Sequence, residues 1–192
     1  MKYIHFKELI KSDLFRYSGH ISCGKFFRYF FTVPGFKYSF FIRCCSYLRD
    51  KKCMRYLLYP FAKVFYLHYS FKYGISIPFT CSIGKGLYIG HFGGIVVHHK
   101  TVIGRNCNIS HCVTIGTSAR GERKGCPKIG DYVYIGPGAK IFGAITIGDN
   151  VAIGANCVVN KDIPDNSVVV GVPGKIISSS KGSTGCIIRT DY

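Results

Sequence analysis

The sequence predicts a mainly β protein, a parallel β-helix preceded by a short α-helical region. The first observation is that Ile or Val recurs at every sixth residue over about 75 residues of the second half. The second is that glycine directly follows many of these positions. The third is that the aromatic residues concentrate before residue 75. The two halves therefore differ in composition, and we expect them to fold differently.

The composition indicates a folded chain with an anionic partner. Of the 192 residues, 47% are hydrophobic and 18% charged, which is enough apolar material for a core and excludes wholesale disorder. The 26 Lys and Arg against 9 Asp and Glu give a net charge of +17. That charge suits nucleic acid, a membrane surface, or a phosphorylated or acidic small molecule. The sequence contains no helix-turn-helix or zinc-finger pattern, so we expect no nucleic-acid partner.

The N-terminus and the cysteines predict a cytoplasmic protein. The first thirteen residues carry acidic and basic side chains and no apolar run of signal-peptide length. The ten cysteines are therefore expected to be reduced thiols. They lack the C-x-x-C spacing of a metal site, so we predict no metal and expect most of them to be small buried hydrophobic residues.

Residues 1–74 predict an aromatic, basic, helical region. They hold 22 of the 29 Phe and Tyr, and 14 Lys and Arg against 3 Asp and Glu, a local net charge of +11. Apolar residues at helical spacing predict several short helices. We expect them over residues 4–17, 36–48 and 54–71, with a helix start at Pro34 and a kink at Pro60.

The composition of this region leaves two explanations open. No uncharged stretch exceeds about eight residues, far short of the roughly 18 to 20 that span a bilayer. Phe, Tyr and Leu mixed with Lys and Arg are typical of a helix that lies in a membrane interface. Such helices would hold the protein at the inner face of an anionic cytoplasmic membrane. Alternatively, the aromatic side chains pack on the second domain and on neighbouring subunits.

Residues 75–177 form a six-residue repeat. With one shift of phase and one interrupting loop, the repeating positions are Ile83, Ile89, Ile95, Val97, Ile103, Ile109, Ile115, Ile129, Ile135, Ile141, Ile147, Ile153 and Val159. A period of six fits a β-helix in which each side is a short strand plus a turn. One branched side chain per side then stacks on that of the next coil, and the following glycine takes a corner conformation that other side chains resist. Residues 178–192 lie beyond the repeat and predict a flexible tail.

The segment Thr117–Pro127 interrupts the repeat and predicts a protruding loop. Loops that leave a rigid scaffold often carry function. With its basic residues Arg120, Arg123 and Lys124, this loop either overhangs the cleft of a neighbouring subunit or remains a solvated loop.

Five motifs within the repeat resemble one known family. They are residues 86–97 (GLYIGHFGGIVV), 113–116 (VTIG), 127–129 (PKI), 135–141 (IGPGAKI) and 171–175 (GVPGK). Together with the repeat, they resemble the hexapeptide-repeat acyltransferases, and among these the serine acetyltransferase branch. The resemblance spans residues 76 to about 177. It implies a left-handed parallel β-helix that assembles as a homotrimer, with the site between adjacent subunits.

The resemblance also implies a reaction in which acetyl-CoA donates an acetyl group to a hydroxyl and His91 is the general base. A histidine suits this role because its ordinary pKa, near 6.5, lets it accept a proton at neutral pH. The residues that the resemblance assigns to acetyl-CoA are Gly116, Pro137, Ala155, Asn160, Lys161 and Lys175. Of the other histidines, His111 could line the cleft, whereas His98 and His99 should be solvated.

Three departures from the serine acetyltransferase pattern concern the acceptor. Ser76 stands where the family has an Asp that orients the histidine, and Gly90 replaces the Asp directly before it. Gly125-Cys126 replaces an Arg-His pair that meets the carboxylate of the amino acid. These positions, together with His111, are the expected acceptor-binding or orienting residues. Because lost polar partners weaken recognition, we predict a sugar hydroxyl in surface or capsular polysaccharide biosynthesis as the acceptor. The alternative is serine O-acetylation in cysteine biosynthesis.

Two further interpretations stay open. One is a covalent acetyl-cysteine route through Cys112 or Cys126, which lie on either side of the predicted loop, although the sequence assigns neither thiol a partner that would stabilise its thiolate. The other is a β-helix scaffold without catalysis, which would fail to bind acetyl-CoA.

Overall fold

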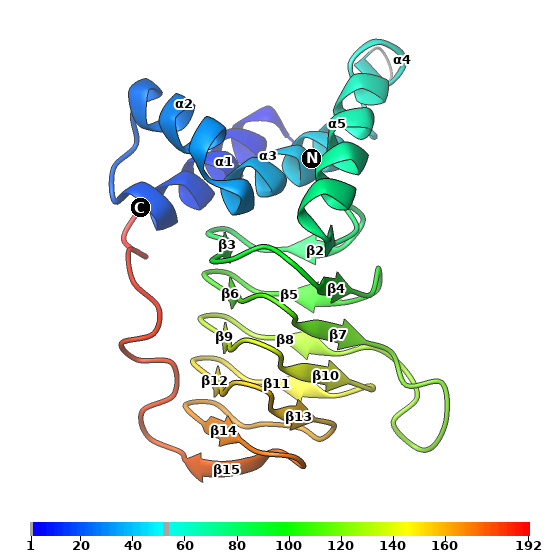
Figure 1. Cartoon of the computed structure of the whole chain (residues 1–192), viewed down its shortest axis with the longest axis vertical. Coiled ribbons are helices and arrows are strands. Elements are labelled where there is room, and N and C mark those ends of the chain that lie inside the picture. The colour runs from blue at the N-terminus through cyan, green and yellow to red at the C-terminus, as the bar shows by residue number, and fades with distance from the viewer. Residues whose placement is uncertain (1, 52–53) are drawn as a thin grey trace.

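The computed structural model describes residues 2–51 and 54–192, with a group of helices at one end of a stack of coils (Figure 1). The helices are α1 (Tyr3–Ser18), α2 (Cys23–Thr32), α3 (Pro34–Leu48), α4 (Met54–Leu57) and α5 (Tyr59–Tyr73). No helix in the described part of the chain is both long and apolar enough to cross a membrane. Gly74 ends α5 in the left-handed conformation, with φ 60°, and the first strand begins at Ile75.

Two features of the helical region differ from the sequence prediction. Helix α2 is not predicted by the apolar spacing; its start is marked by Ser22, whose side chain accepts a 3.2 Å hydrogen bond from the backbone N–H of Lys25. The chain breaks between α4 and α5, and Pro60 lies in the first turn of α5 instead of kinking one long helix. Proline suits that position because the first turn has no partner for its missing N–H.

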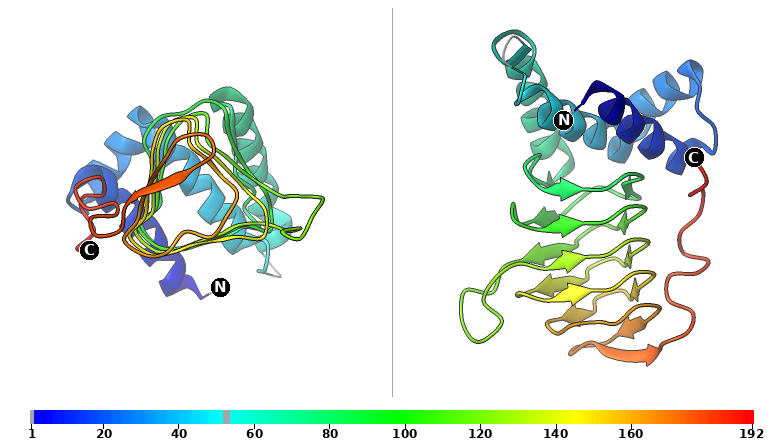
Figure 2. Two further views of the ribbon diagram at one scale, coloured as in Figure 1. Left: turned by 90° about the horizontal axis from the view of Figure 1, so that it is seen from below. Right: turned by 180° about the vertical axis from the view of Figure 1, so that it is seen from behind.

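The strands are short and lie in three sheets, one on each side of a triangular prism (Figure 2). Sheet A contains β1 (Ile75–Ser76), β4 (Ile95–Val97), β7 (Thr114–Gly116), β10 (Lys140–Phe142) and β13 (Val158–Val159). Sheet B contains β2 (Ser82–Ile83), β5 (Val102–Ile103), β8 (Lys128–Ile129) and β11 (Thr146–Ile147). Sheet C contains β3 (Tyr88–Ile89), β6 (Asn108–Ile109), β9 (Tyr134–Ile135), β12 (Ala152–Ile153), β14 (Val168–Val170) and β15 (Lys175–Ser178).

Successive coils pair in parallel, and β15 alone among these strands turns back antiparallel, onto β14. The predicted parallel β-helix is therefore confirmed. The mainly β description is only partly met, because more of the described residues lie in helices than in strands. Most sides of a coil contribute only two or three residues to the ladder, and the rest of each side forms the corner.

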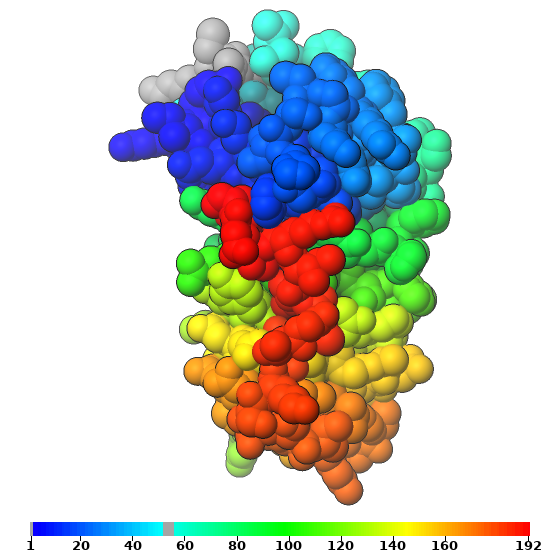
Figure 3. Space-filling view, turned by 90° about the vertical axis from the view of Figure 1, so that its left-hand side faces the viewer, coloured from blue at the N-terminus to red at the C-terminus, as the bar shows by residue number. Residues whose placement is uncertain are grey.

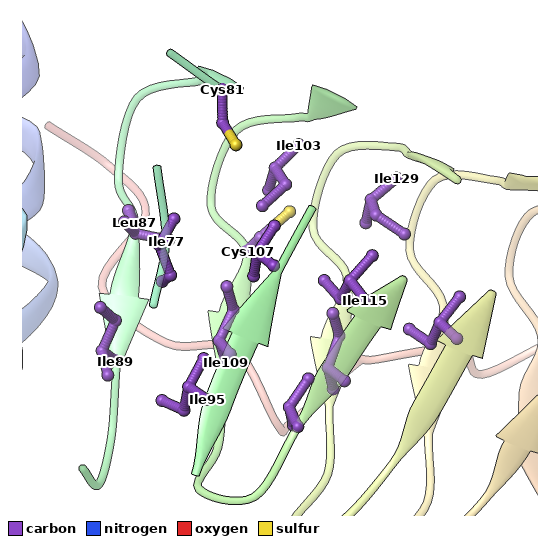
Figure 4. Packing of buried hydrophobic residues seen from close by; sticks show 14 of the residues in the cluster. Ile77, Cys81, Leu87, Ile89, Ile95, Ile103, Cys107, Ile109, Ile115 and Ile129 are labelled. Atoms are coloured by element: carbon purple, nitrogen blue, oxygen red, sulfur yellow. The ribbon is translucent and has the colours of Figure 1, made fainter. Parts of the chain in front are cut away.

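The repeating branched side chains form the core and stack from coil to coil (Figure 4). In sheet C, Ile89, Ile109 and Ile135 pair in register, and each is at most 1% exposed. Burying one such side chain stabilises the fold by about 1.5–3 kcal/mol. Ile83 is the exception, because it lies in the first coil and is only partly buried.

Most of the glycines that follow the core residues, Gly104 among them, are required for space and not for their backbone angle. The expectation of an unusual corner conformation is wrong for them, because none of these glycines has a positive φ. Left-handed residues occur two positions later in the corner, as at Asn106 (φ 55°) and Asn150 (φ 53°). A Cβ atom on Gly104 would instead lie 2.4 Å from the carbonyl oxygen of Gly130 in the next coil. Coils therefore approach one another too closely for a side chain at this position.

This packing predicts that Gly104→Ala destabilises the protein, whereas Gly116→Ala does not. A Cβ on Gly116 meets nothing nearer than Thr114 Cγ2, at 4.0 Å. Overpacking of the kind expected at Gly104 costs about 1–3 kcal/mol. Urea denaturation of the two variants measures the difference. Equal midpoints would show that the close approach between coils does not constrain the sequence.

The helices close the first coil of the β-helix with buried polar contacts. The carboxylate of Asp13 in α1 pairs with the guanidinium of Arg43 in α3, with a 3.0 Å contact between Oδ2 and Nε. Arg43 also donates to the carbonyl oxygens of Ile83 and Gly84, at 2.7 and 2.6 Å. Asp13 accepts from the backbone N–H of Leu87 at 2.9 Å. Backbone groups that end the ladder are thus satisfied by helix side chains, which stops the coils from pairing further.

The C-terminal segment after β15 packs along the β-helix and reaches the helices (Figure 3). Ser183 is 2% exposed, and its hydroxyl donates to the carbonyl oxygen of Tyr132 at 2.6 Å. The Tyr192 hydroxyl donates to Asn106 Oδ1 at 3.0 Å, and Arg16 Nε donates to the carbonyl oxygen of Ile188 at 2.9 Å. These contacts hold the segment that the sequence predicts to be a flexible tail.

Candidate functional site

One edge of the prism collects the corners that lead from sheet C to sheet A. It consists of residues 90–94, 110–113, 136–139 and 154–157, and we call it the histidine edge. The backbone N–H of Gly138 donates to the carbonyl oxygen of His111 at 3.0 Å, and that of Asn156 donates to Pro137 at 2.8 Å. The regular stacking of coils therefore aligns His91, His111, Pro137 and Ala155 along one line.

His91 is exposed at this edge, directly after β3. Its ring centroid lies 5.8 Å from that of His111, and the two planes are nearly perpendicular, at 82°. The pair arises because the two residues occupy equivalent corners in successive coils, after paired strands β3 and β6. An exposed imidazole can reach a substrate hydroxyl, which is the first requirement for a general base.

His111 is partly buried, and its Nδ1 atom is buried without a hydrogen-bond partner among the described residues. Leaving a buried polar atom unpaired costs about 1–3 kcal/mol. Such atoms in folded proteins commonly mark a place where water or a ligand binds. The imidazole beside His91 is therefore available for an additional contact.

In the part of the chain that the structure describes, neither Ser76 nor Gly90 is hydrogen-bonded to the His91 ring. Ser76 is an exposed residue of β1 and pairs with Val96 of the next coil. Within residues 2–51 and 54–192, no hydrogen bond joins it to His91. The backbone N–H of Gly90 donates to Ile109 at 3.3 Å, so this residue continues the ladder.

The opposite edge of sheet A collects the corners that lead to sheet B. It consists of residues 98–101, 117–127, 143–145 and 160–162, together with Gly116 at the end of β7, and we call it the loop edge. The segment Thr117–Pro127 protrudes here, as predicted from the interrupted repeat (Figure 2). It is closed by two 3.0 Å backbone hydrogen bonds between Ser118 and Gly125, and Arg123 forms a 2.8 Å ion pair with Asp162.

Three of the residues assigned to acetyl-CoA lie at the loop edge. Gly116 ends β7 opposite Phe142, and Lys161 is exposed just beyond β13. Asn160 lines a hollow of about 400 Å³ together with Arg120 and Arg123. Lys175 is also exposed, but it lies in β15, the last strand of sheet C, and not at either edge.

A second hollow at the loop edge, of about 640 Å³, is lined by Cys126 and His98. The Sγ atom of Cys126 lies 3.0 Å from Nδ1 of His98. His98 is partly buried, so the expectation of a solvated side chain is wrong for it; His99 is exposed as expected. The contact joins corners of successive coils. The repeat predicts that these corners are neighbours, but it does not predict where the loop places Cys126.

The candidate residues therefore divide between the two edges that flank sheet A. His91, His111, Pro137 and Ala155 lie on the histidine edge, and Gly116, Cys126, Asn160 and Lys161 on the loop edge. Strands of sheet A separate the two groups within one copy of the chain. In residues 2–51 and 54–192, no group of three His, Cys, Asp or Glu side chains gathers in a way that could hold a metal ion.

Comparison with known proteins agrees with this architecture. The model of the bacterial transferase hexapeptide family (six repeats) matches residues 126–161. Serine acetyltransferase from Mycobacterium tuberculosis is 43% identical over 112 residues, which cover 58% of this chain and 49% of that protein. The chain thus spans about half the length of this curated relative.

Solved structures extend the likeness to the helical region. Serine acetyltransferase from Neisseria gonorrhoeae in complex with serine superposes with a TM-score of 0.73 and 32% identity, over 92% of this chain and 70% of that one. The enzyme from Brucella abortus in complex with coenzyme A gives a TM-score of 0.76 and 28% identity, over 94% and 70%. The repeat, the aligned corner histidines and these similarities have one common explanation: the chain belongs to the hexapeptide-repeat acyltransferases, in their serine acetyltransferase-like branch.

Proposed function

We propose that the protein is an acetyl-CoA-dependent O-acetyltransferase and that L-serine is its acceptor. The observation that carries the proposal is the exposed His91 ring on an edge shared with His111, within a fold that matches serine acetyltransferases. One structural relative is described as a complex with coenzyme A and another as a complex with serine.

His91 would act as the general base at the acceptor hydroxyl. It accepts the hydroxyl proton as the oxygen attacks the acetyl carbon, so that a C–O bond forms and the C–S bond breaks. The proton then passes from the imidazole to the departing sulfur. Acetyl-CoA, when bound, supplies the acetyl thioester.

The chain's residues fit a long, phosphorylated donor. Pro137 and Ala155 present a regular backbone edge beside His91, and Lys161 and Lys175 are exposed cations that suit phosphate groups. The hollow beside Asn160 is lined by Arg120, whose guanidinium also matches phosphate geometry. Donor-binding residues on both edges of sheet A support a homotrimer in which the histidine edge of one copy meets the loop edge of the next.

We expect His111, and not Ser76, to orient the catalytic imidazole. His111 lies one coil from His91, and its Nδ1 has no partner in residues 2–51 and 54–192, where no hydrogen bond joins Ser76 to the His91 ring either. His111→Ala should lower kcat by about 10- to 100-fold with little change in KM, because a misplaced base lowers the rate of the chemical step. It should also move the pH–rate profile, which a merely structural defect would not do. Ser76→Ala is the matched control; if it lowers kcat more than His111→Ala, the assignment is wrong.

Thiol release from acetyl-CoA tests the function. A saturable dependence of release on L-serine supports the proposal, and no release with any hydroxyl acceptor would contradict it. The second candidate is transfer to a sugar hydroxyl in polysaccharide biosynthesis. It is favoured by Ser76, Gly90 and Cys126, which replace the polar groups expected to orient the histidine or to hold serine. Release with nucleotide- or lipid-linked sugars, and none with serine, would select this candidate.

We further propose that the helices hold the enzyme at the cytoplasmic face of an anionic membrane. Helices α2 and α5 expose large apolar side chains, among them Phe31 (69%), Phe61 (65%) and Phe71 (83%). A cation lies between the same two helices, because Lys37 Nζ is 5.8 Å from the ring centroid of Phe30 in α2 and 5.2 Å from that of Tyr69 in α5. Apolar groups flanked by cations suit an anionic interface. Co-sedimentation with phosphatidylglycerol vesicles, and none with phosphatidylcholine vesicles, is the expected result; co-sedimentation with neither contradicts it.

A further inference from the structure

Cys126 and His98 form a thiol–imidazole pair on the loop edge, and no step of the proposed acetyl transfer gives this pair a chemical role. The 3.0 Å contact joins Cys126 Sγ to His98 Nδ1, and the two residues are 28 positions apart in the sequence. His98 directly follows β4, and Cys126 closes the loop that follows β7, the next strand of sheet A. Pairing of β4 with β7 brings the two corners together, and the return of the loop to β8 places Cys126 beside His98.

A backbone contact sets the direction of the hydrogen bond within the pair. The N–H of Lys100 donates to the same Nδ1 atom of His98, at 3.3 Å. Nδ1 therefore carries a lone pair and the ring proton lies on Nε2. The remaining proton in the contact belongs to the thiol, so Cys126 donates and His98 accepts.

The surroundings keep the imidazole neutral and the thiol reachable. Partial desolvation and the neighbouring His99 and Lys100 all lower the pKa of His98, which leaves the ring uncharged at neutral pH and able to take a proton. The 640 Å³ hollow opens onto Cys126, and Lys100 and Lys124 line it. Nearby positive charge stabilises a thiolate.

The other thiols differ from Cys126 in exposure or in partner. Burial raises the pKa of the neighbouring Cys81 thiol to about 11, so this residue remains a protonated, largely inert thiol. Cys112 is exposed at the histidine edge, and no imidazole hydrogen bond to its sulfur is present among the described residues. Cys112 therefore offers a control of at least equal exposure without the base.

We propose that Cys126 is a nucleophilic thiol, with His98 as its base, that forms mixed disulfides with low-molecular-weight disulfides entering this hollow. The Cys126 proton passes to His98 Nδ1, and the longer 3.3 Å contact with Lys100 is given up. The thiolate attacks one sulfur of the incoming disulfide. A new S–S bond forms to Cys126, the old S–S bond breaks, and the other sulfur leaves as a thiolate. The incoming disulfide is thus the oxidant, and a reducing thiol reverses the step.

Site-resolved labelling of the full chain with a chromogenic aryl disulfide tests this proposal. Released thiolate gives the total rate, and peptide mapping by mass spectrometry after brief exposure assigns it to individual cysteines. We expect Cys126 to react about tenfold faster than Cys112 at neutral pH, because His98 can take its proton as the sulfur attacks.

Two variants separate a base from a simple hydrogen-bond acceptor. His98→Asn places an amide oxygen near the position of Nδ1 that accepts a hydrogen bond but takes no proton, and should reduce the Cys126 rate by about tenfold without changing that of Cys112. His98→Gln is a second variant without a base and should slow the Cys126 reaction in the same way. Thermal midpoints equal to that of the unmodified protein verify that both variants fold. Equal rates at Cys126 and Cys112, or an unchanged Cys126 rate in His98→Asn, would overturn the proposal. The readout is labelling and not acetyl transfer, so it is independent of the proposed function.

Discussion

Replacement of His91 by alanine should reduce acetyl-CoA-dependent thiol release by about 10²- to 10⁴-fold, the usual contribution of a positioned general base. The expectation rests on the exposed His91 ring at the corner after β3. Its neighbour His111 cannot substitute for it, because the centroid of that ring lies 5.8 Å away and part of it is buried.

The measurement is the initial rate of thiol release with saturating acceptor. His20→Ala is a suitable control, because His20 is an exposed histidine in the helical region and has no assigned role. A His91→Ala protein that retains the full rate would exclude His91 as the base. A loss of rate that His20→Ala shares would indicate a general effect of removing a surface histidine.

Replacement of Arg43 by methionine should cause the largest loss of stability. The variant leaves the carboxylate of Asp13, which is 1% exposed, without its ionic partner. It also removes the donors to the carbonyl oxygens of Ile83 and Gly84. Breaking a buried ion pair costs about 3–5 kcal/mol, which for a chain of this size lowers the thermal midpoint by roughly 10 °C.

The same substitution at Arg105 supplies the matched control. Arg105 pairs with Asp131 at 2.7 Å, but its side chain is 60% exposed. Exposed ion pairs add little to stability because water and salt screen them, so Arg105→Met should leave the midpoint almost unchanged. Thermal unfolding followed by circular dichroism compares the two variants. Equal shifts would mean that the buried pair does not hold the helices on the first coil.

The β-helix could be predicted from the sequence because Ile or Val recurs at every sixth residue. Ile135 and Ile153 lie 18 residues apart, which is one coil of three six-residue sides, and they pair in register as expected. The same register places His91 one coil from His111. The sequence alone therefore predicts the relative positions of residues that lie within the repeat.

Contacts made by segments that lie outside the repeat, the loop Thr117–Pro127 and the C-terminal segment, could not be predicted. The partner of Cys126 depends on how the loop Thr117–Pro127 returns to its coil, and no periodicity governs that path. The docking of Tyr192 on Asn106 depends on surface complementarity between segments 86 residues apart. The reason for a glycine at position 104 does not follow from the sequence, because the repeat does not distinguish a need for space from a need for an unusual backbone angle.

In the proposed enzyme, the histidine edge of one copy and the loop edge of another form one acetyl-CoA site. Mixed assemblies of two inactive variants test it directly. One chain carries His91→Ala, and the other carries Asn160→Asp and Lys161→Glu, which place negative charge where phosphates are expected to bind. Co-assembly should restore thiol release well above that of either parent, because some shared sites then contain both intact edges. A mixture no more active than its parents would show that the two edges do not form a shared site between copies, which would contradict the proposed acetyl-CoA site.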